Sequence, residues 1–199
     1  MKHTGLFFGS FNPVHIGHMA IANYMVEYTT LDQVWFVVSP HNPLKKKTSL
    51  LSDYHRLELV RLSLRDDPRF RVTNIEFKLP QPSYTIDTLT RLEEKYPTHN
   101  FSLIMGADNL ITLHKWKNFE QILDRWSLIV YPRKGSDTAD IPENLKSRLS
   151  PENYTLVRAP QIEISSTALR KAIREGRDMR FFFPEPVYQY VRDMHFYEK

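Results

Sequence analysis

The segment Gly9–His18, with the sequence GSFNPVHIGH, combines residue types that can bind an anion. His15 and His18 are three positions apart, so on a helix their imidazole rings lie on one face. A helix that begins here directs its free N–H groups and its positive end toward the same place. Gly9 permits close approach of the backbone, and Gly17 leaves room for a ligand against the helix. The segment therefore predicts a phosphate-binding loop. Surface histidines or a two-histidine metal site are the alternatives, although no third metal ligand stands at a matched spacing.

A second candidate anion site lies near the C-terminus, in the sequence ISSTALR at 164–170. Ser165 or Ser166 is suited to cap a helix, and Thr167 then falls in its first turn. Arg170 follows three residues later and reaches the same helix end. Free amides, hydroxyl groups and a guanidinium together suit a polyphosphate. An ordinary capped helix with a solvated arginine is the alternative.

The elements that must position these segments alternate between strands and helices. The strands expected are 4–8, 34–38, 101–105, 128–131 and 154–158, with 69–78 extended. The helices expected are 14–28, 53–64 behind a Ser52 cap, 85–96, 107–123 with an interruption near 116–118, 166–175 and 185–194. This alternation predicts an α/β fold, a Rossmann-like parallel sheet flanked by helices on both faces. Ligands then bind beyond the carboxyl ends of the strands. Residues 1–199 are expected to form a single domain with a helical C-terminal portion from about residue 166.

Composition narrows the functional classes. The 199 residues are 41% hydrophobic and 25% charged, which is typical of a globular chain and not of a disordered one. Cysteine is absent, which excludes disulfide scaffolds, cysteine nucleophiles and thiolate zinc sites. No apolar run approaches the roughly 18 residues of a membrane span, and no signal peptide is evident. A cytoplasmic protein without a membrane partner is therefore expected.

The charge distribution favours a local anion site. The net charge is +4, and residues 158–180 hold six basic residues against three acidic ones. A nucleic-acid-binding module is the alternative from another functional class, with Phe181–Phe183 beside Arg177 and Arg180 as its best candidate surface. Packing between helices explains these phenylalanines more simply, so no nucleic-acid partner is expected.

The two site motifs together resemble those of the H-x-G-H nucleotidyltransferase superfamily. Within it, the chain is similar nearly end to end to the bacterial nicotinate-nucleotide adenylyltransferases. The other agreeing segments are SPHNPLK at 39–45, YHRLELV at 54–60, PSYTIDTL at 82–89, MGADNL at 105–110, KWK at 115–117 and PEPV at 184–187. The departures are Phe8-Gly9 for a common Gly-Gly, Leu169 for a usual isoleucine, and a looser turn at 132–135. The sequence His-Ile-Gly-His at 15–18 also occurs in class I aminoacyl-tRNA synthetases. Those enzymes need a Lys-Met-Ser-Lys-Ser-type loop as well, and this sequence has none.

The resemblance implies transfer of the adenylyl group of ATP to nicotinate mononucleotide, giving deamido-NAD and pyrophosphate. The mononucleotide phosphate would attack in line, without a covalent intermediate. The residues implied in catalysis are His15, His18 and Arg170. Those implied to bind ATP are Gly9, Ser10, Phe11, Lys45, Gly106, Asp108, Arg133, Ser166 and Thr167. Those implied to bind the mononucleotide are Asn42, Thr85, which would receive the nicotinate carboxylate, and Trp116, which would stack on the pyridine ring. Mg²⁺ is expected to arrive with ATP, because it typically takes few protein ligands.

Several alternatives stay open at this stage. Backbone amides favour a carboxylate over an amide, which favours the acid substrate, but an enzyme for nicotinamide mononucleotide or for both substrates is the nearest rival. A phosphopantetheine adenylyltransferase shares the first loop and lacks the segment around Trp116. A nucleotide sensor without turnover is a further rival. The oligomeric state cannot be predicted from the sequence.

Overall fold

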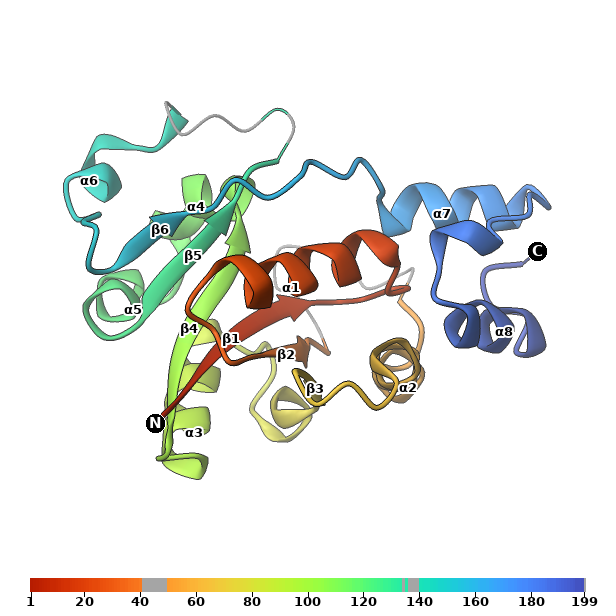
Figure 1. The fold of residues 1–199 in the computed structure, drawn as a ribbon, viewed down its shortest axis with the longest axis horizontal. Helices are drawn as coiled ribbons and strands as arrows, with labels where there is room; N and C mark the ends of the chain where they lie inside the picture. Colours follow the sequence, from red (N-terminus) through yellow and green to blue (C-terminus); the bar gives the residue numbers. More distant parts are fainter. Residues whose placement is uncertain (41–49, 134, 136–139, 199) are drawn as a thin grey trace.

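The described part of the chain forms a six-stranded, wholly parallel sheet in the order β3-β2-β1-β4-β5-β6 (Figure 1). This computed structural model describes residues 1–40, 50–133, 135 and 140–198. The strands are β1 (Lys2–Gly9), β2 (Gln33–Val38), β3 (Phe70–Thr73), β4 (His99–Gly106), β5 (Ser127–Tyr131) and β6 (Tyr154–Leu156). The strand order reverses at β1, which pairs with both β2 and β4. In such sheets the ligand crevice opens beyond the carboxyl ends of the strands at this reversal.

The central strands bury both of their faces. Phe7 and Phe36 point into one hydrophobic core, whereas their neighbours Leu6 and Trp35 point into another. The first core includes residues of α1, α2, α7 and α8, and the second includes residues of α3 to α6. Continuous apolar runs are expected for parallel strands that helices cover on both sides. The predicted Rossmann-like arrangement is thereby confirmed.

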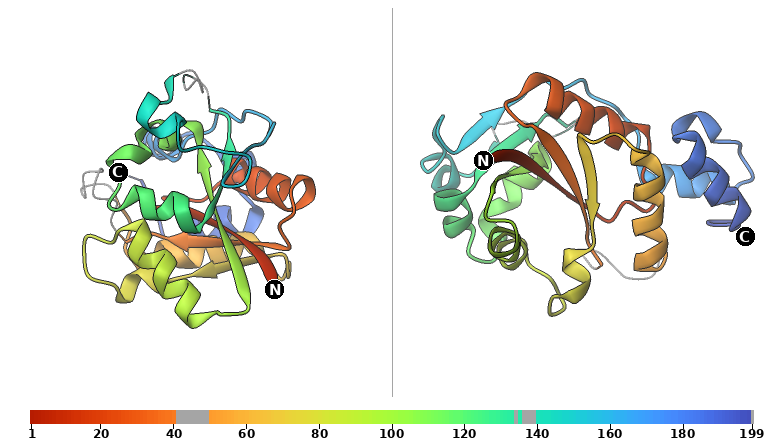
Figure 2. Two further views of the ribbon diagram at one scale, coloured as in Figure 1. Left: turned by 90° about the vertical axis from the view of Figure 1, so that its left-hand side faces the viewer. Right: turned by 60° about the horizontal axis from the view of Figure 1, so that its bottom comes forward.

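Six helices lie between successive strands of the described chain, and two more follow the last strand. The helices are α1 (Ile16–Tyr28), α2 (Asp53–Leu64), α3 (Thr85–Lys95), α4 (Ala107–Thr112), α5 (Phe119–Arg125), α6 (Glu143–Lys146), α7 (Ser166–Arg174) and α8 (Glu185–Asp193). The described residues also include the 3₁₀ turns η2 (Ile75–Lys78), before α3, η3 (Leu113–Lys115), between α4 and α5, and η5 (Arg180–Phe182), between α7 and α8. Figure 2 shows α1 and α3 on opposite sides of the sheet.

Most predicted boundaries agree with the structure to within a few residues. The Ser52 side chain caps α2 as predicted, accepting from the N–H of His55. Helix α1 begins at Ile16 and not at Val14, because His15 is in an extended conformation (φ −148°) at its N-cap. The extended segment predicted for 69–78 is wrong over η2, where the chain makes a 3₁₀ turn. That turn directs the carboxylate of Glu76 into the interior, where it accepts a hydrogen bond from Thr88.

The C-terminal helices α7 and α8 lie past the carboxyl end of β1 (Figure 1). Helix α8 packs against α2, and its buried residues Val187 and Val191 join the core on that face of the sheet. This placement brings the second predicted anion motif, at the start of α7, to the end of β1 that carries the first. Among the described residues, no helix is both long and apolar enough to span a bilayer.

Candidate active site

A cavity of about 980 Å³ opens at the carboxyl ends of the central strands. The loops after β1, β4 and β5, the start of α3 and the start of α7 all contribute to its walls. The predicted site residues that line it are Gly9, Ser10, Phe11, His15, His18, Thr85, Asp108, Trp116, Arg133, Ser166, Thr167 and Arg170. The fold therefore brings segments from the whole length of the chain to one cavity. Asn42 and Lys45, which were also predicted, lie outside the described residues.

His15 and His18 stand at the N-terminus of α1 with their ring centroids 3.8 Å apart. The main-chain N–H of His15 donates to Nδ1 of His18, 3.2 Å away. Because Nδ1 accepts, the proton of the neutral His18 ring lies on Nε2. His18 is therefore oriented to donate from Nε2.

His15 is buried at the floor of the cavity, with 4% of its surface exposed. Burial, and next the charge of Arg133, lower its pKa to about 4, so the ring is neutral near pH 7. Its Nδ1 atom is buried and has no hydrogen-bond partner among the described residues.

Two glycines of the first loop make room for side chains of the site. A Cβ atom on Gly17 would lie 3.0 Å from Nδ1 of His15, and a Cβ on Gly9 would lie 2.8 Å from Cζ of Phe11. Both glycines also line the cavity, and the structure gives them a further role. They admit the rings of His15 and Phe11, and the Phe11 ring packs edge-on against His18 at 5.2 Å.

The two predicted anion motifs are joined directly to each other. Ser165 caps α7 by accepting from the N–H of Ala168, which leaves the hydroxyl of Ser166 to donate to the carbonyl of Pro13 at 2.9 Å. Arg170 Nη1 donates to the carbonyl of Asn12 at 2.7 Å. The start of α7 is thus attached to the loop before α1, and both helix N-termini border one cavity.

Thr85 and Trp116 line another part of the cavity wall. Thr85 is the first residue of α3, and no side-chain hydrogen bond caps this helix. Lys117 forms an ion pair with Asp87 (3.0 Å), and its ammonium lies 4.7 Å from the centre of the Tyr84 ring. These contacts hold the turn that carries Trp116 against the start of α3. Thr85 and the half-buried indole of Trp116 therefore border the same cavity from neighbouring positions.

Asp108 and Arg133 form a third part of the wall, with an ion pair of 3.2 Å. A Cβ atom on Gly106 would lie 2.5 Å from Asp108 Oδ1 and 2.6 Å from Arg133 Cδ. Gly106 is not itself a lining residue, and its missing side chain makes room for this pair. Asp108 Oδ1 is a buried acceptor that has no hydrogen-bond partner within the described part of the chain.

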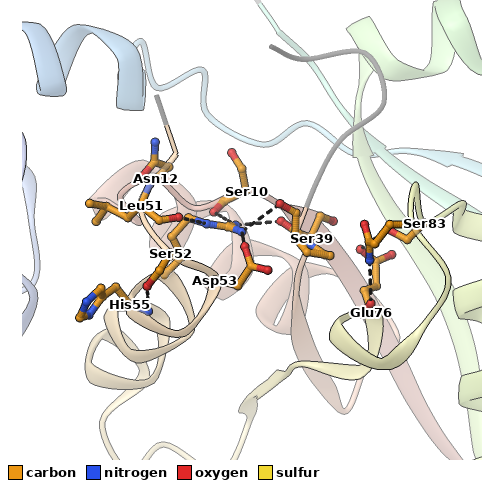
Figure 3. A network of polar contacts seen from close by, with 12 residues as sticks. Ser10, Asn12, Ser39, Leu51, Ser52, Asp53, His55, Glu76 and Ser83 are labelled. Carbon is orange, nitrogen blue, oxygen red and sulfur yellow. Dashed lines mark hydrogen bonds and ion pairs between the residues drawn. The ribbon is translucent and has the colours of Figure 1, made fainter. Parts of the chain in front are cut away.

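Arg56 was not identified as a site residue from the sequence. Its hydrogen bonds connect chain segments that lie beside the cavity. Its guanidinium is fully buried and donates to the carbonyls of Ser10 (2.6 Å), Ser39 (2.8 Å), Leu51 and Pro40. It also forms an ion pair of 2.6 Å with Asp53. The bonds at Ser10, Ser39, Leu51 and Asp53 can be followed in Figure 3. One arginine thus fixes three chain segments beside the cavity. No sequence pattern marks it apart from other helical arginines.

Glu76 lines the cavity and was also not identified from the sequence. Its carboxylate accepts from Thr88 (2.7 Å) and from Ser83 (3.3 Å), which Figure 3 shows pointing toward it. Burial raises the pKa of this carboxyl group, and the hydrogen bonds from hydroxyl groups partly oppose the rise. Glu76 thereby holds the turn that leads into Thr85. A short polar 3₁₀ turn gives no periodic signal from which this could be predicted.

No group of three or more His, Cys, Asp or Glu side chains in the described ranges is arranged to hold a metal ion.

Comparison with known proteins identifies the family. The model of the cytidylyltransferase-like family matches residues 6–172. A probable nicotinate-nucleotide adenylyltransferase of Flavobacterium johnsoniae is 51% identical over 195 residues, 98% of each chain. A protein of the same name from Bacteroides thetaiotaomicron is 47% identical over 190 residues, 96% of this chain and 91% of its own.

Solved structures share the fold at much lower identity. The Plasmodium falciparum nicotinic acid mononucleotide adenylyltransferase complexed with NaAD superposes with a TM-score of 0.79 at 18% identity, covering 99% of this chain and 98% of its own. A putative nicotinate-nucleotide adenylyltransferase from Vibrio parahaemolyticus gives 0.70 at 21% identity, over 100% and 97%. Two helix starts that border one cavity, together with near-complete matches at about half identity, place this chain in the cytidylyltransferase-like family and, within it, among the nicotinate-nucleotide adenylyltransferases.

Proposed function

We propose that the protein transfers the adenylyl group of ATP to nicotinate mononucleotide, giving deamido-NAD and pyrophosphate. One observation carries the assignment: α7 is hydrogen-bonded to the loop before α1, and the starts of both helices border one cavity, whose wall also holds Thr85 and Trp116. A dinucleotide product needs such a cavity, with a polyphosphate subsite and a pyridine subsite in the same space.

In this reaction an oxygen of the mononucleotide phosphate attacks the α-phosphorus of ATP. A new P–O bond forms, the bond from the α-phosphorus to the bridging oxygen breaks, and pyrophosphate leaves in line. The attacking phosphate is already an anion, so no general base is required. Catalysis then consists of positioning and of neutralising the charge that spreads over the phosphates, which preorganised donors do best.

The ATP phosphates would lie over the start of α1. His18, with its proton on Nε2, and neutral His15 would donate to phosphate oxygens, beside the backbone of Gly9, Ser10 and Phe11. Lys45 would add a contact to phosphate. Gly106, Asp108 and Arg133 would border the nucleoside, where the unpaired Asp108 Oδ1 supplies an acceptor for a ribose hydroxyl.

Ser166, Thr167 and Arg170 would hold the departing pyrophosphate at the start of α7. The hydrogen bonds of Ser166 and Arg170 to the first loop support this. They bring the residues proposed to hold pyrophosphate next to the residues proposed to hold the ATP phosphates. ATP would enter as its Mg²⁺ complex. The metal is then part of the substrate and keeps several of its waters.

The nicotinate carboxylate would lie at the start of α3, beside Thr85, where free N–H groups and the helix dipole favour an anion. Trp116 would stack on the pyridine ring, and Asn42 would assist in holding the mononucleotide. A carboxamide presents donors to the same amides and would bind less well. The enzyme would act in the cytoplasm, where ATP is abundant, with residues 1–199 working as one catalytic unit.

The test is pyrophosphate release from Mg-ATP with nicotinate mononucleotide, nicotinamide mononucleotide or phosphopantetheine as the acceptor. Release mainly with the nicotinate compound is expected. Comparable release with nicotinamide mononucleotide would show that the carboxylate does not decide the choice of substrate. The reaction would still be the transfer of an adenylyl group. Salt-sensitive binding of oligonucleotides without turnover on any acceptor would overturn the proposal.

A paired variant tests the pyridine subsite separately. Trp116→Ala is expected to raise KM for nicotinate mononucleotide about tenfold or more, because stacking on an aromatic side chain typically contributes 1–3 kcal/mol. Trp116→Phe retains a ring and is expected to lose less. A KM for ATP that rises as much as the KM for the mononucleotide would contradict this placement of Trp116.

A further inference from the structure

The C-terminal segment after α8 reaches back to the first loop. The hydroxyl of Tyr197 donates to Oδ1 of Asn12 at 2.8 Å, although the two residues are 185 positions apart. The segment is held in place on both sides of the contact. Phe196 is buried and packs against His55 and Tyr190 at 4.8 and 5.6 Å between ring centroids.

The backbone here adopts an uncommon conformation. His195 and Tyr197 both have positive φ angles, of 51° and 66°. Residues with a Cβ atom seldom occupy this region unless the surrounding structure holds them there. The N–H of Phe196 donates to the carbonyl of Val191, which turns the chain back on the end of α8. These features direct the phenol of Tyr197 toward Asn12.

Asn12 connects Tyr197 to the predicted catalytic arginine. Its side chain is almost fully buried, and Oδ1 accepts from the N–H of Leu51 (3.2 Å) as well as from Tyr197. The main-chain carbonyl of the same residue accepts from Arg170 Nη1 at 2.7 Å. Arg170 Nη2 donates to Thr167 Oγ1 at 3.2 Å. The guanidinium is thereby oriented by one contact within α7 and one contact to Asn12.

Burial raises the pKa of the Tyr197 phenol, so it is a protonated donor throughout the neutral range. Asn12 Oδ1 can only accept, and its two donors come from segments far apart in the chain. If the Tyr197 hydroxyl is removed, Asn12 Oδ1 loses the shorter of these two hydrogen bonds. The carbonyl on which Arg170 rests then loses part of its support.

We propose that Tyr197 is a positioning residue for Arg170: through Asn12, it fixes the guanidinium in the orientation that binds the pyrophosphate moiety. This rests on the proposed function for the role of pyrophosphate as product. The contact does not bring Tyr197 to the reacting atoms. It links the last residues of the chain to the site that the first loop and α7 form together.

The test is Tyr197→Phe, which keeps the ring and removes only the hydroxyl. The matched control is Tyr190→Phe, which removes a phenol hydroxyl from the same aromatic cluster, where it contacts His55 Nδ1 (2.9 Å) and not Asn12. The first readout is the Kd of inorganic pyrophosphate by calorimetry. We expect about fivefold to tenfold weaker binding for Tyr197→Phe, the size of one hydrogen bond. We expect no change for Tyr190→Phe.

The second readout is a double-mutant cycle with Arg170→Ala. If Tyr197 acts through Arg170, Tyr197→Phe weakens pyrophosphate binding in the parent and has no effect in the Arg170→Ala background. Equal weakening in both backgrounds, or unchanged binding in the parent, overturns the proposal. In turnover, kcat is expected to fall about as much, with KM for nicotinate mononucleotide unchanged.

The experiments distinguish a failure of the proposed function from a failure of the proposed role of Tyr197. A parent protein that binds pyrophosphate without turning over ATP would contradict the proposed function, and the binding cycle would still test Tyr197. Removal of residues 197–199 provides a second variant if Tyr197→Phe does not fold. It leaves Phe196 in its packed position and is expected to reproduce the loss of pyrophosphate affinity. Undiminished affinity in the shortened chain would equally overturn the role of Tyr197.

Discussion

The hydroxyl of Ser166 donates a hydrogen bond of 2.9 Å to the main-chain carbonyl of Pro13, across 153 positions of sequence. This contact joins the start of α7 to the loop before α1. Two features that are each common by themselves, a histidine pair at a helix start and a capped helix with an arginine, thereby border the same cavity. The predictions below test the residues on which that arrangement depends.

His18→Ala is expected to lower kcat by roughly 10²–10³, because removal of one preorganised donor at a site of developing charge typically costs that much. The ring lies at the surface of the cavity, so the fold should be retained, as circular dichroism would show. His3→Ala, which alters an exposed histidine near the start of β1, is the matched control and should leave kcat unchanged. Unchanged turnover in a folded His18→Ala protein would remove His18 from the mechanism.

Arg56→Met is expected to lower the free energy of unfolding by about 3–5 kcal/mol, as measured by urea denaturation. The side chain is fully buried, and its loss leaves the carbonyls of three segments without their donor. Arg61→Met is the control on the same helix. Arg61 is exposed and forms an ion pair with Glu58 at the surface, so the unfolding curve should stay close to that of the parent. A small effect of Arg56→Met, no larger than that of the control, would contradict the role given to Arg56.

The stability of the protein is expected to fall between pH 6.5 and pH 4 through His15. Burial lowers its folded-state pKa from 6.5 to about 4, so over this range the unfolded chain binds a proton that the folded chain does not. The loss amounts to about 3 kcal/mol by pH 4. This loss of stability should be absent in His15→Asn. Urea unfolding curves of the parent and of the variant at pH 7 and pH 4 measure it.

His195→Asn serves as the control for this measurement, because His195 is an exposed histidine. Between pH 7 and pH 4, the free energy of unfolding of His195→Asn should fall as much as that of the parent. If parent and His15→Asn lose stability in parallel as the pH falls, the depressed pKa of His15 is wrong.

Glu76→Gln is expected to gain stability relative to the parent as the pH rises. Burial raises the folded-state pKa of Glu76 above 4.5, so the folded protein favours the protonated carboxyl. That favourable contribution is complete below pH 4.5 and is lost as the pH rises through the folded pKa. Unfolding curves at pH 4.5 and pH 8 measure the difference. Glu152→Gln, at an exposed position, should show no such trend, and a trend of opposite sign for Glu76→Gln would refute the assignment.

Much of this fold follows from local sequence patterns. The apolar runs that become β1 and β2 are strands because β-branched and aromatic residues suit a sheet that is covered on both faces. Ser52 and Ser165 mark the starts of α2 and α7, because a side-chain oxygen there satisfies an otherwise free N–H group. These signals depend only on neighbouring residues. They therefore allowed the strand and helix alternation, and the two anion motifs, to be predicted.

Other features depend on contacts that no local pattern encodes. Arg56 and Glu76 resemble ordinary helix and turn residues in the sequence, and only the packed chain surrounds them with carbonyls or hydroxyl groups. The local sequence also did not reveal that the missing side chains of Gly9 and Gly17 make room for Phe11 and His15.

The class of fold, the motifs and the family resemblance could be predicted before folding was considered, since they depend on residue type, order and spacing along the chain. That Asn12 accepts from Tyr197 and from Arg170, and that His15 is buried and neutral, became evident from the folded chain alone. The physical reason is that hydrogen-bond partners and desolvation depend on atoms brought together by folding. For Asn12 those partners lie more than 150 positions away in the sequence.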